Sequence, residues 1–227
     1  MAKTIPLASQ EVRWFFEGPA NQHESLKRWF ETVAPIPKGP GVGSPVWKVR
    51  LNDDPDGYLL VPDSDDMGIK WREGELQIKG RVSSIGTQVY CERHQGKIER
   101  WVKWSYSDMP AGYKRLFVIG KETGLITASV RKTRALRKVR LDTMTGKAQE
   151  VDAQTFVDRG LGFELTDLEV AGKAYCSLAF EAFPNDSAMD AAFTQALEAF
   201  LDGLKDVDLT AACSQSYPAW LGGIFVA

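Results

Sequence analysis

The sequence predicts an α+β fold that is predominantly antiparallel β, with a few helices. Short segments in which apolar and polar residues alternate recur along the 227 residues, and Gly- or Asp-containing turns separate them. Only two segments repeat apolar residues at helical spacing instead. No internal repeat, low-complexity tract or shift in composition divides the chain, so we expect a single domain over residues 1–227.

The first predicted strand covers residues 11–16 and ends at Gly18-Pro19. Asn21, with Glu24 three residues later, is expected to cap a helix as a capping box. That helix carries one apolar stripe: Leu26, Trp29, Phe30 and Val33. A segment rich in Pro and Gly, residues 35–45, is predicted to be a loop.

Most of the remaining chain is predicted to be strand. The expected strands are residues 58–61, 67–72, 75–82, 89–94, 97–106, 115–120, 125–141 and 174–183. Turns are expected at Glu73-Gly74 and at residues 122–124, and Gln95-Gly96 is the strongest hairpin candidate. The clearest helix follows, with Ser187 as its cap and Gly203 near its end. Its apolar positions are Met189, Phe193, Ala196, Leu197, Phe200, Leu201 and Leu204.

Composition limits the classes of function. Hydrophobic residues make up 44% and charged residues 26% of the chain, as in a globular protein with a core. The net charge of -2 argues against nucleic-acid binding, which needs a basic surface. No apolar run is long enough to cross a bilayer, and the N-terminus lacks a signal-peptide core. Three widely spaced cysteines without a CxxC pair favour reduced thiols. We therefore expect a soluble cytoplasmic protein with no membrane or nucleic-acid partner.

Basic residues alternate along several predicted strands, which places them on one face of the sheet. Lys70 and Arg72 flank Trp71, and Lys79 and Arg81 flank Gly80. In the predicted strand 125–141, four basic residues share one parity: Lys132, Arg134, Lys138 and Arg140. This pattern has two interpretations: a solvated outer face balanced by acids, or the lining of a cavity that receives a polyanion.

The order of motifs along nearly the whole chain resembles the CYTH superfamily, the triphosphate tunnel enzymes. The motifs are Glu11-Val12-Arg13-Trp14-Phe15, Lys70-Trp71-Arg72, Lys79-Gly80-Arg81, Lys132-Thr133-Arg134, Phe180-Glu181-Ala182-Phe183 and Ser216-Tyr217-Pro218-Ala219-Trp220-Leu221. The resemblance implies a closed antiparallel β tunnel with flanking helices and a charged lumen. It also implies binding of a triphosphate, a polyphosphate or a related phosphorylated anion.

The resemblance also implies roles for individual residues. Phosphate oxygens would be held by Arg13, Lys70, Arg72, Lys79, Arg81, Lys132 and Arg134. Glu11 and Glu181 would hold Mg²⁺ or Mn²⁺, and a member that keeps the activity would be a metal-dependent triphosphatase-type phosphohydrolase. In the first motif, however, Arg13 replaces an acid and Phe15 replaces a lysine. This chain is therefore expected to be a divergent member, with anion binding favoured over catalysis and the two glutamates serving mainly as counter-ions.

Two alternatives remain open on the sequence alone. A β barrel could bind an apolar or aromatic ligand, with Ile69, Trp71 and Ile78 inside and the cations outside. The domain could also be a structural module whose basic face meets an acidic protein. Two acidic segments, residues 52–57 and 63–66, lack the spacing of a calcium-binding loop, and His23 and His94 show no metal-ligand pairing.

Overall fold

The computed structural model describes residues 6–49, 54–110, 112–117, 125–142, 145 and 147–226. The strands are β1 (Leu7–Glu17), β2 (Trp47–Val49), β3 (Asp56–Leu60), β4 (Met67–Arg72), β5 (Glu75–Tyr90), β6 (His94–Tyr106), β7 (Ile126–Asp142), β8 (Lys147–Val151), β9 (Gly160–Val170) and β10 (Lys173–Phe183). The helices are η1 (Ala20–Gln22), α1 (Glu24–Thr32), α2 (Gly112–Leu116), α4 (Ser187–Leu201), η2 (Ala211–Cys213) and α5 (Tyr217–Phe225).

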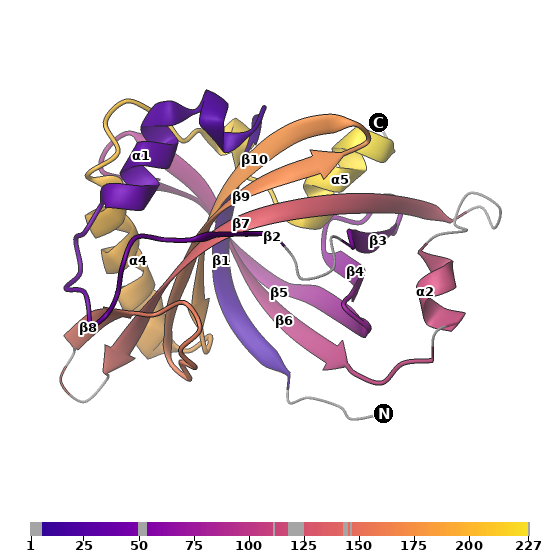
Figure 1. Cartoon of the computed structure of the whole chain (residues 1–227), viewed down its shortest axis with the longest axis horizontal. Coiled ribbons are helices and arrows are strands. Elements are labelled where there is room, and N and C mark those ends of the chain that lie inside the picture. Colours follow the sequence, from indigo (N-terminus) through magenta and orange to yellow (C-terminus); the bar gives the residue numbers. More distant parts are fainter. Residues whose placement is uncertain are drawn as a thin grey trace.

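Eight of these strands close into an antiparallel barrel. Their order around the ring is β7, β3, β4, β5, β6, β1, β10 and β9, and β9 pairs again with β7. The short strands β2 and β8 add to β7 beyond the part that pairs with β3. Figure 1 shows the long strands crossing one another, with α1 and α4 at one end and α5 and α2 at the other. The predicted fold class, a closed antiparallel barrel with flanking helices, is confirmed.

The larger hydrophobic core lies outside the barrel wall. On β1, Val12 and Trp14 are buried in this core, while Glu11 and Arg13 have the opposite parity and line the interior. Leu26 and Phe30 of α1 and the apolar face of α4 cover the wall; Phe30 contacts Phe163 of β9 with ring centroids 5.3 Å apart. The helices therefore bury the apolar face of the sheet, and the interior is free to hold polar side chains.

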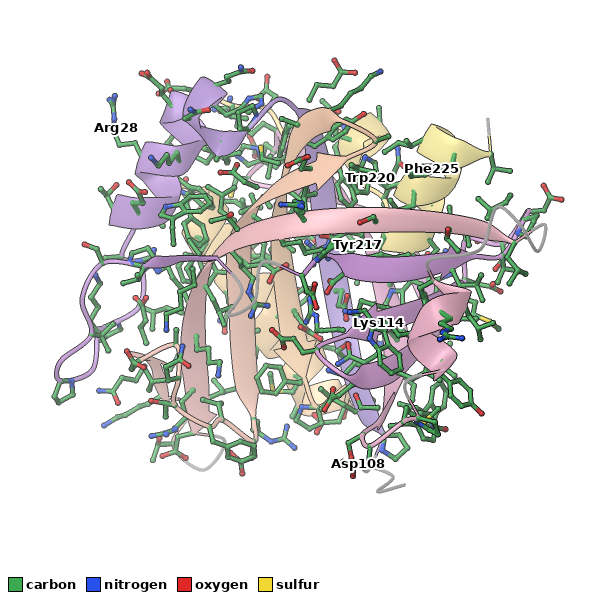
Figure 2. All side chains as sticks on the ribbon, turned by 45° about the vertical axis from the view of Figure 1, so that its right-hand side comes forward. Arg28, Asp108, Lys114, Tyr217, Trp220 and Phe225 are labelled. Atoms are coloured by element: carbon green, nitrogen blue, oxygen red, sulfur yellow. The ribbon has the colours of Figure 1, made fainter. Side chains whose placement is uncertain are left out.

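A smaller apolar cluster fills one end of the barrel interior. Phe15 stacks on Trp220 of α5 with ring centroids 4.2 Å apart, and Leu168, Val170 and Leu221 pack around them. Tyr217 and Trp220 lie where α5 meets the barrel (Figure 2). Ser216 caps this helix, since its Oγ accepts a hydrogen bond from the backbone N–H of Ala219 at 3.3 Å. The helix therefore closes this end of the barrel.

The predicted hairpin forms between β5 and β6, but its turn was placed too late in the chain. Residues 75–82 and 89–90, expected in separate strands, belong to the continuous β5, and the turn to β6 lies at residues 91–93. Gln95 and Gly96 lie inside β6. A Cβ on Gly96 would come within 2.4 Å of the Trp14 ring and 2.6 Å of Val12. This glycine therefore permits close packing against β1 and does not form a turn.

Other local predictions also need correction. Asn21 lies in the short helix η1, and His23 occupies the N-cap of α1 without a capping hydrogen bond from its side chain. The α4 cap is Asp186, one residue before the predicted Ser187. Arg115 lies in α2, where a strand was expected; the rest of that expected strand and the turn at 122–124 lie largely outside the described residues. Strands β8 and β9 were not predicted. In the described part of the chain, no helix is both long and apolar enough to span a bilayer.

Candidate functional site

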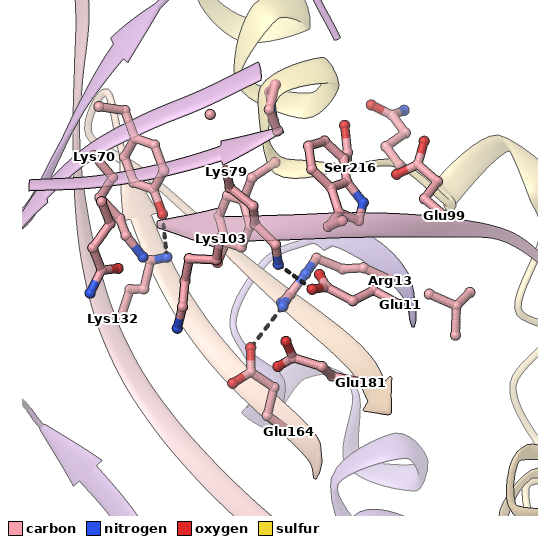
Figure 3. Close-up of a pocket in the computed structure, with 18 of the residues that line it drawn as sticks. Glu11, Arg13, Lys70, Lys79, Glu99, Lys103, Lys132, Glu164, Glu181 and Ser216 are labelled. Atoms are coloured by element: carbon pink, nitrogen blue, oxygen red, sulfur yellow. Dashed lines mark hydrogen bonds and ion pairs between the residues drawn. The ribbon is translucent and has the colours of Figure 1, made fainter. Parts of the chain in front are cut away.

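The barrel encloses a cavity of about 220 Å³, to which all eight strands of the ring contribute side chains. Figure 3 shows its charged groups pointing toward one another from the surrounding strands. The lining comprises Glu11, Val12, Arg13, Tyr58, Gly68, Lys70, Arg72, Gln77, Lys79, Lys97, Glu99, Trp101, Lys103, Lys132, Arg134, Glu164, Glu181, Gln215, Ser216, Tyr217 and Pro218. Eight of these residues are cationic and four are carboxylates.

Most of the predicted site residues meet in this cavity. The lining includes Arg13, Lys70, Arg72, Lys79, Lys132, Arg134, Glu11 and Glu181. Arg81 is the exception: the β5–β6 register shifts just after it, and its guanidinium binds Asp65 at 2.6 Å and Glu99 at 2.7 Å. The residues that an apolar barrel would place inside, Ile69, Trp71 and Ile78, are not part of the lining.

Glu164 was not predicted, although it holds two of the cations. Arg13 donates to its Oε1 at 2.9 Å and Arg134 to its Oε2 at 3.2 Å, while a second nitrogen of Arg13 donates to Ser177 at 3.0 Å. Burial would raise the pKa of Glu164, but Arg13 and Arg134 outweigh it and hold the pKa far below its usual value. Alternation of apolar Phe163 and Leu165 around Glu164 was the missed sequence signal.

Asp56 forms a second anchor for the cations. It is fully buried, accepts two hydrogen bonds from Arg72 at 3.0 and 3.2 Å, and lies 3.3 Å from Lys132. Despite burial, Lys132, Lys70 and Arg72 hold its pKa far below its usual value. Lys132 also donates to the Tyr58 hydroxyl at 2.7 Å. Burial raises the pKa of Tyr58 to about 12, so this hydroxyl stays protonated.

Glu11 and Glu181 form a carboxyl pair on the opposite wall. They face each other directly across β1 and β10, and Lys79 forms an ion pair with Glu11. Burial would raise the pKa of Glu11, but Lys79 together with hydrogen bonds from Ser9 and Glu181 lowers it to about 2. Burial and the negative charge of Glu11 raise the pKa of Glu181. The pair therefore favours one ionised and one protonated carboxyl group.

The carboxyl pair does not fit a divalent metal. Mg²⁺ and Mn²⁺ need several oxygen ligands. Here Glu11 already forms an ion pair with Lys79, and the neighbouring Arg13 is a fixed cation that repels a metal ion. Among the described residues, no group of three or more His, Cys, Asp or Glu side chains has an arrangement that could hold a metal. The geometry matches the expected counter-ion role better than the expected metal-ligand role.

Two cavity lysines have no counter-ion. Within the described residues, neither Lys70 nor Lys103 forms a hydrogen bond or an ion pair with a carboxylate. Burial, and then the nearby positive charge of Arg72, lower the pKa of Lys70 well below its usual value. Lys103 lies directly opposite Lys79 in the β5–β6 pair, where like charges repel. The cavity therefore has positive charge that its own side chains do not neutralise.

Comparisons with known proteins give structural neighbours only. No family model matches the chain, and no curated protein matches it. A conserved hypothetical protein from Pyrococcus furiosus is similar in structure, with 12% sequence identity, a TM-score of 0.36, and coverage of 88% of this chain and 94% of that chain. The PH1012 protein from Pyrococcus horikoshii OT3 has 16% identity, the same TM-score of 0.36 and the same coverage of 88% and 94%.

Proposed function

We propose that the barrel cavity binds a small anion with several phosphate groups, such as a triphosphate or polyphosphate. The observation that carries this proposal is the excess of cationic over acidic side chains in the lining, eight against four, with Lys103 outside the ion pairs of the described residues. Cations of this kind bind phosphate oxygens strongly in a site that excludes much of the water, arginine through two parallel hydrogen bonds and lysine as a point charge.

Arg13, Arg72, Lys132 and Arg134 supply further positive charge around the same cavity. Their carboxylate partners Glu164 and Asp56 keep these side chains extended into the lumen in the absence of a ligand. Phosphate oxygens can then bind the remaining N–H donors of the guanidinium and ammonium groups without a large rearrangement. The ordered motifs that resemble the CYTH superfamily support the same ligand class.

We infer that binding needs no divalent metal. Arg13 provides a permanent positive charge beside the carboxyl pair, and Lys79 neutralises Glu11. A ligand phosphate would therefore contact protein cations at the position where a metal-dependent member of the CYTH superfamily would hold a metal ion. The chain is proposed to be a divergent tunnel protein that acts as a receptor for phosphorylated anions.

A thermal-shift titration with tripolyphosphate and with ATP, each with and without Mg²⁺ or Mn²⁺, tests this function. A ligand that binds only the folded state stabilises it by about 2.7 kcal/mol at one hundred times its Kd. We expect tripolyphosphate to raise the Tm without metal. A shift that requires metal and is accompanied by phosphate release would instead favour hydrolysis. The absence of a shift with either phosphate ligand would refute the function.

Matched lysine variants locate the binding. Lys103→Ala removes a cavity cation and is expected to weaken tripolyphosphate binding by at least about tenfold, as for the loss of one charge-assisted contact of about 1.5–3 kcal/mol. Lys205→Ala is the control, because Lys205 is exposed and pairs with Asp202 near the end of α4. Equal affinity of the two variants would place the binding elsewhere.

A further inference from the structure

Lys70 lies in an environment that few surface lysines share. It lies on β4, directly opposite Tyr58 of β3 on one side and Gln77 of β5 on the other, and all three residues line the cavity. Its ammonium nitrogen lies 5.9 Å from the centre of the Tyr58 ring. On the same ring, 5.2 Å from its centre, lies the nitrogen of Lys132. The amine is therefore enclosed by protein on both sides and has another cation nearby.

Among the described residues, the ion pairs around Lys70 do not include it. Asp56, the nearest acidic anchor, binds Arg72 and Lys132. No hydrogen bond or carboxylate pair reaches Lys70 from the described residues, and Figure 3 shows it at the cavity wall above Lys132. A lysine that is desolvated next to other cations loses its proton more readily, and its neutral amine is a nucleophile. Burial and the charge of Arg72 lower the pKa of Lys70 in this way.

We propose that Lys70 is an amine nucleophile that forms an imine with a small phosphorylated aldehyde, whose phosphate is held by the other cations of the cavity. This inference rests on the proposed function, because the same cations select the phosphate. The structure thus assigns one ligand two points of attachment, a phosphate bound by charge and a carbonyl carbon bound covalently. Lys103 also faces a cation, but that residue, Lys79, is paired with Glu11. Lys70 instead lies near Arg72 and Lys132, which share the one carboxylate of Asp56.

The reaction is a condensation and needs no oxidant or reductant. The nitrogen lone pair of Lys70 attacks the carbonyl carbon, a C–N bond forms, and the C=O double bond opens to a hydroxyl group. The two hydrogens of the amine leave with the carbonyl oxygen as water, and a C=N double bond remains. The step is reversible, so excess water returns the free amine and the aldehyde.

Trapping with borohydride tests this role. The protein is incubated with pyridoxal phosphate, the imine is reduced with borohydride, and the modified lysines are mapped by mass spectrometry. At neutral pH, each unit by which an amine's pKa falls increases its neutral fraction about tenfold. We expect Lys70 to be labelled at least about tenfold faster than the exposed Lys205 and to reach its maximal rate at a lower pH. Labelling spread evenly over exposed lysines would overturn the proposal.

Two further arms separate the contributions of amine and phosphate. Lys70→Arg removes the nucleophile, so the adduct at this position disappears, while the exposed Lys205 is still labelled at the wild-type rate. Pyridoxal, which lacks the phosphate, is expected to label Lys70 at least about tenfold more slowly, in line with the loss of one charge-assisted contact. Equal labelling rates for pyridoxal phosphate and pyridoxal would show that the phosphate does not contribute to recognition of the aldehyde.

The two proposals fail in different ways. A thermal shift with tripolyphosphate but no adduct at Lys70 refutes the imine and leaves the phosphate site standing. An adduct at Lys70 that forms equally fast with pyridoxal, without any thermal shift from tripolyphosphate, refutes the phosphate site. Inhibition of labelling by tripolyphosphate would place the two ligands in one cavity.

Discussion

Arg13 distinguishes this cavity at the scale of a single residue. In the motif that the N-terminal strand resembles, an acid is expected at this position. The guanidinium instead binds Glu164 and Ser177 and lies 4.8 Å from the centre of the Tyr217 ring. A carboxylate contributes to a metal site, whereas this side chain adds fixed positive charge. A fixed cation beside the carboxyl pair therefore disfavours a metal ion at this position.

Glu181 permits a prediction on stability at this scale. The pKa of Glu181 is higher in the folded than in the unfolded state. The contribution of Glu181 to stability is therefore fully present below its unfolded-state pKa, near 4.5, and is lost as pH rises through its folded-state pKa. Glu181→Gln keeps a hydrogen-bonding group and removes the charge that repels Glu11. We expect its Tm at pH 8 to exceed that of the wild type by about 2–4 °C, the shift that 1 kcal/mol produces in a domain of this size. Scanning calorimetry at pH 4 and pH 8 measures this, and a lower Tm at pH 8 would contradict it.

At the scale of elements, α5 determines where the polar interior ends. Trp220 packs flat on Phe15, and Tyr217 lies with its ring 3.9 Å below the nitrogen of Lys132. Ser216 ties the start of the helix to the β3–β4 loop, since its hydroxyl donates to the backbone oxygen of Asp65 at 3.1 Å. The helix thus joins the smaller apolar cluster to the charged cavity, and Tyr217 contacts both.

Trp220→Ala tests the contribution of this helix. Truncation of a buried tryptophan leaves a cavity and costs about 3–5 kcal/mol. The expected result is a loss of this size in the free energy of unfolding, measured by chemical denaturation. Phe156→Ala is the matched control, because Phe156 is 83% exposed and should change stability by less than about 0.5 kcal/mol. Similar losses for both variants would mean that α5 does not anchor the barrel end.

The whole molecule has its apolar core outside the barrel and its charges inside. Helices α1 and α4 cover the outer wall, and Arg137 and Glu150 form a buried ion pair beneath them at 2.7 Å. Inside, carboxylates from β1, β3, β9 and β10 compensate only part of the positive charge. The ion pairs that contribute to stability therefore also line the cavity.

This arrangement predicts sensitivity to acid. The pKa values of Glu11, Asp56 and Glu164 are lowered in the fold, so their stabilising contribution is present above their unfolded values of 3.8–4.5 and is lost as pH falls toward 2. We expect the Tm to fall steeply over this window. Glu164→Gln should lower the Tm at pH 7, because it breaks a partly buried ion pair, and should make the fall in Tm toward pH 2 less steep. If the Tm of this variant fell as steeply with pH as that of the wild type, Glu164 would contribute little to the acid sensitivity.

The sequence predicted local features where the chain is regular. Strand 67–72 was placed correctly, and the burial of Leu26, Trp29 and Phe30 on α1 followed from their spacing. Errors arose where packing overrides a local signal: Gly96 resembles a turn residue, yet it serves contact with Trp14. The turn itself uses Cys91 and Glu92 with positive φ angles of 49° and 58°, which no local preference indicates.

The sequence by itself determined that Lys70 and Arg72 share a face, because the strand period of two fixes the parity of residues within one strand. Only the tertiary structure decided what those cations meet. Arg13 binds Glu164, 151 residues away, and Lys132 lies beside Tyr58, 74 residues away. These neighbours come from closure of the barrel. Closure also decides which cations form ion pairs and which, like Lys70 and Lys103, form none among the described residues, since periodicity orients a side chain but cannot select its partner.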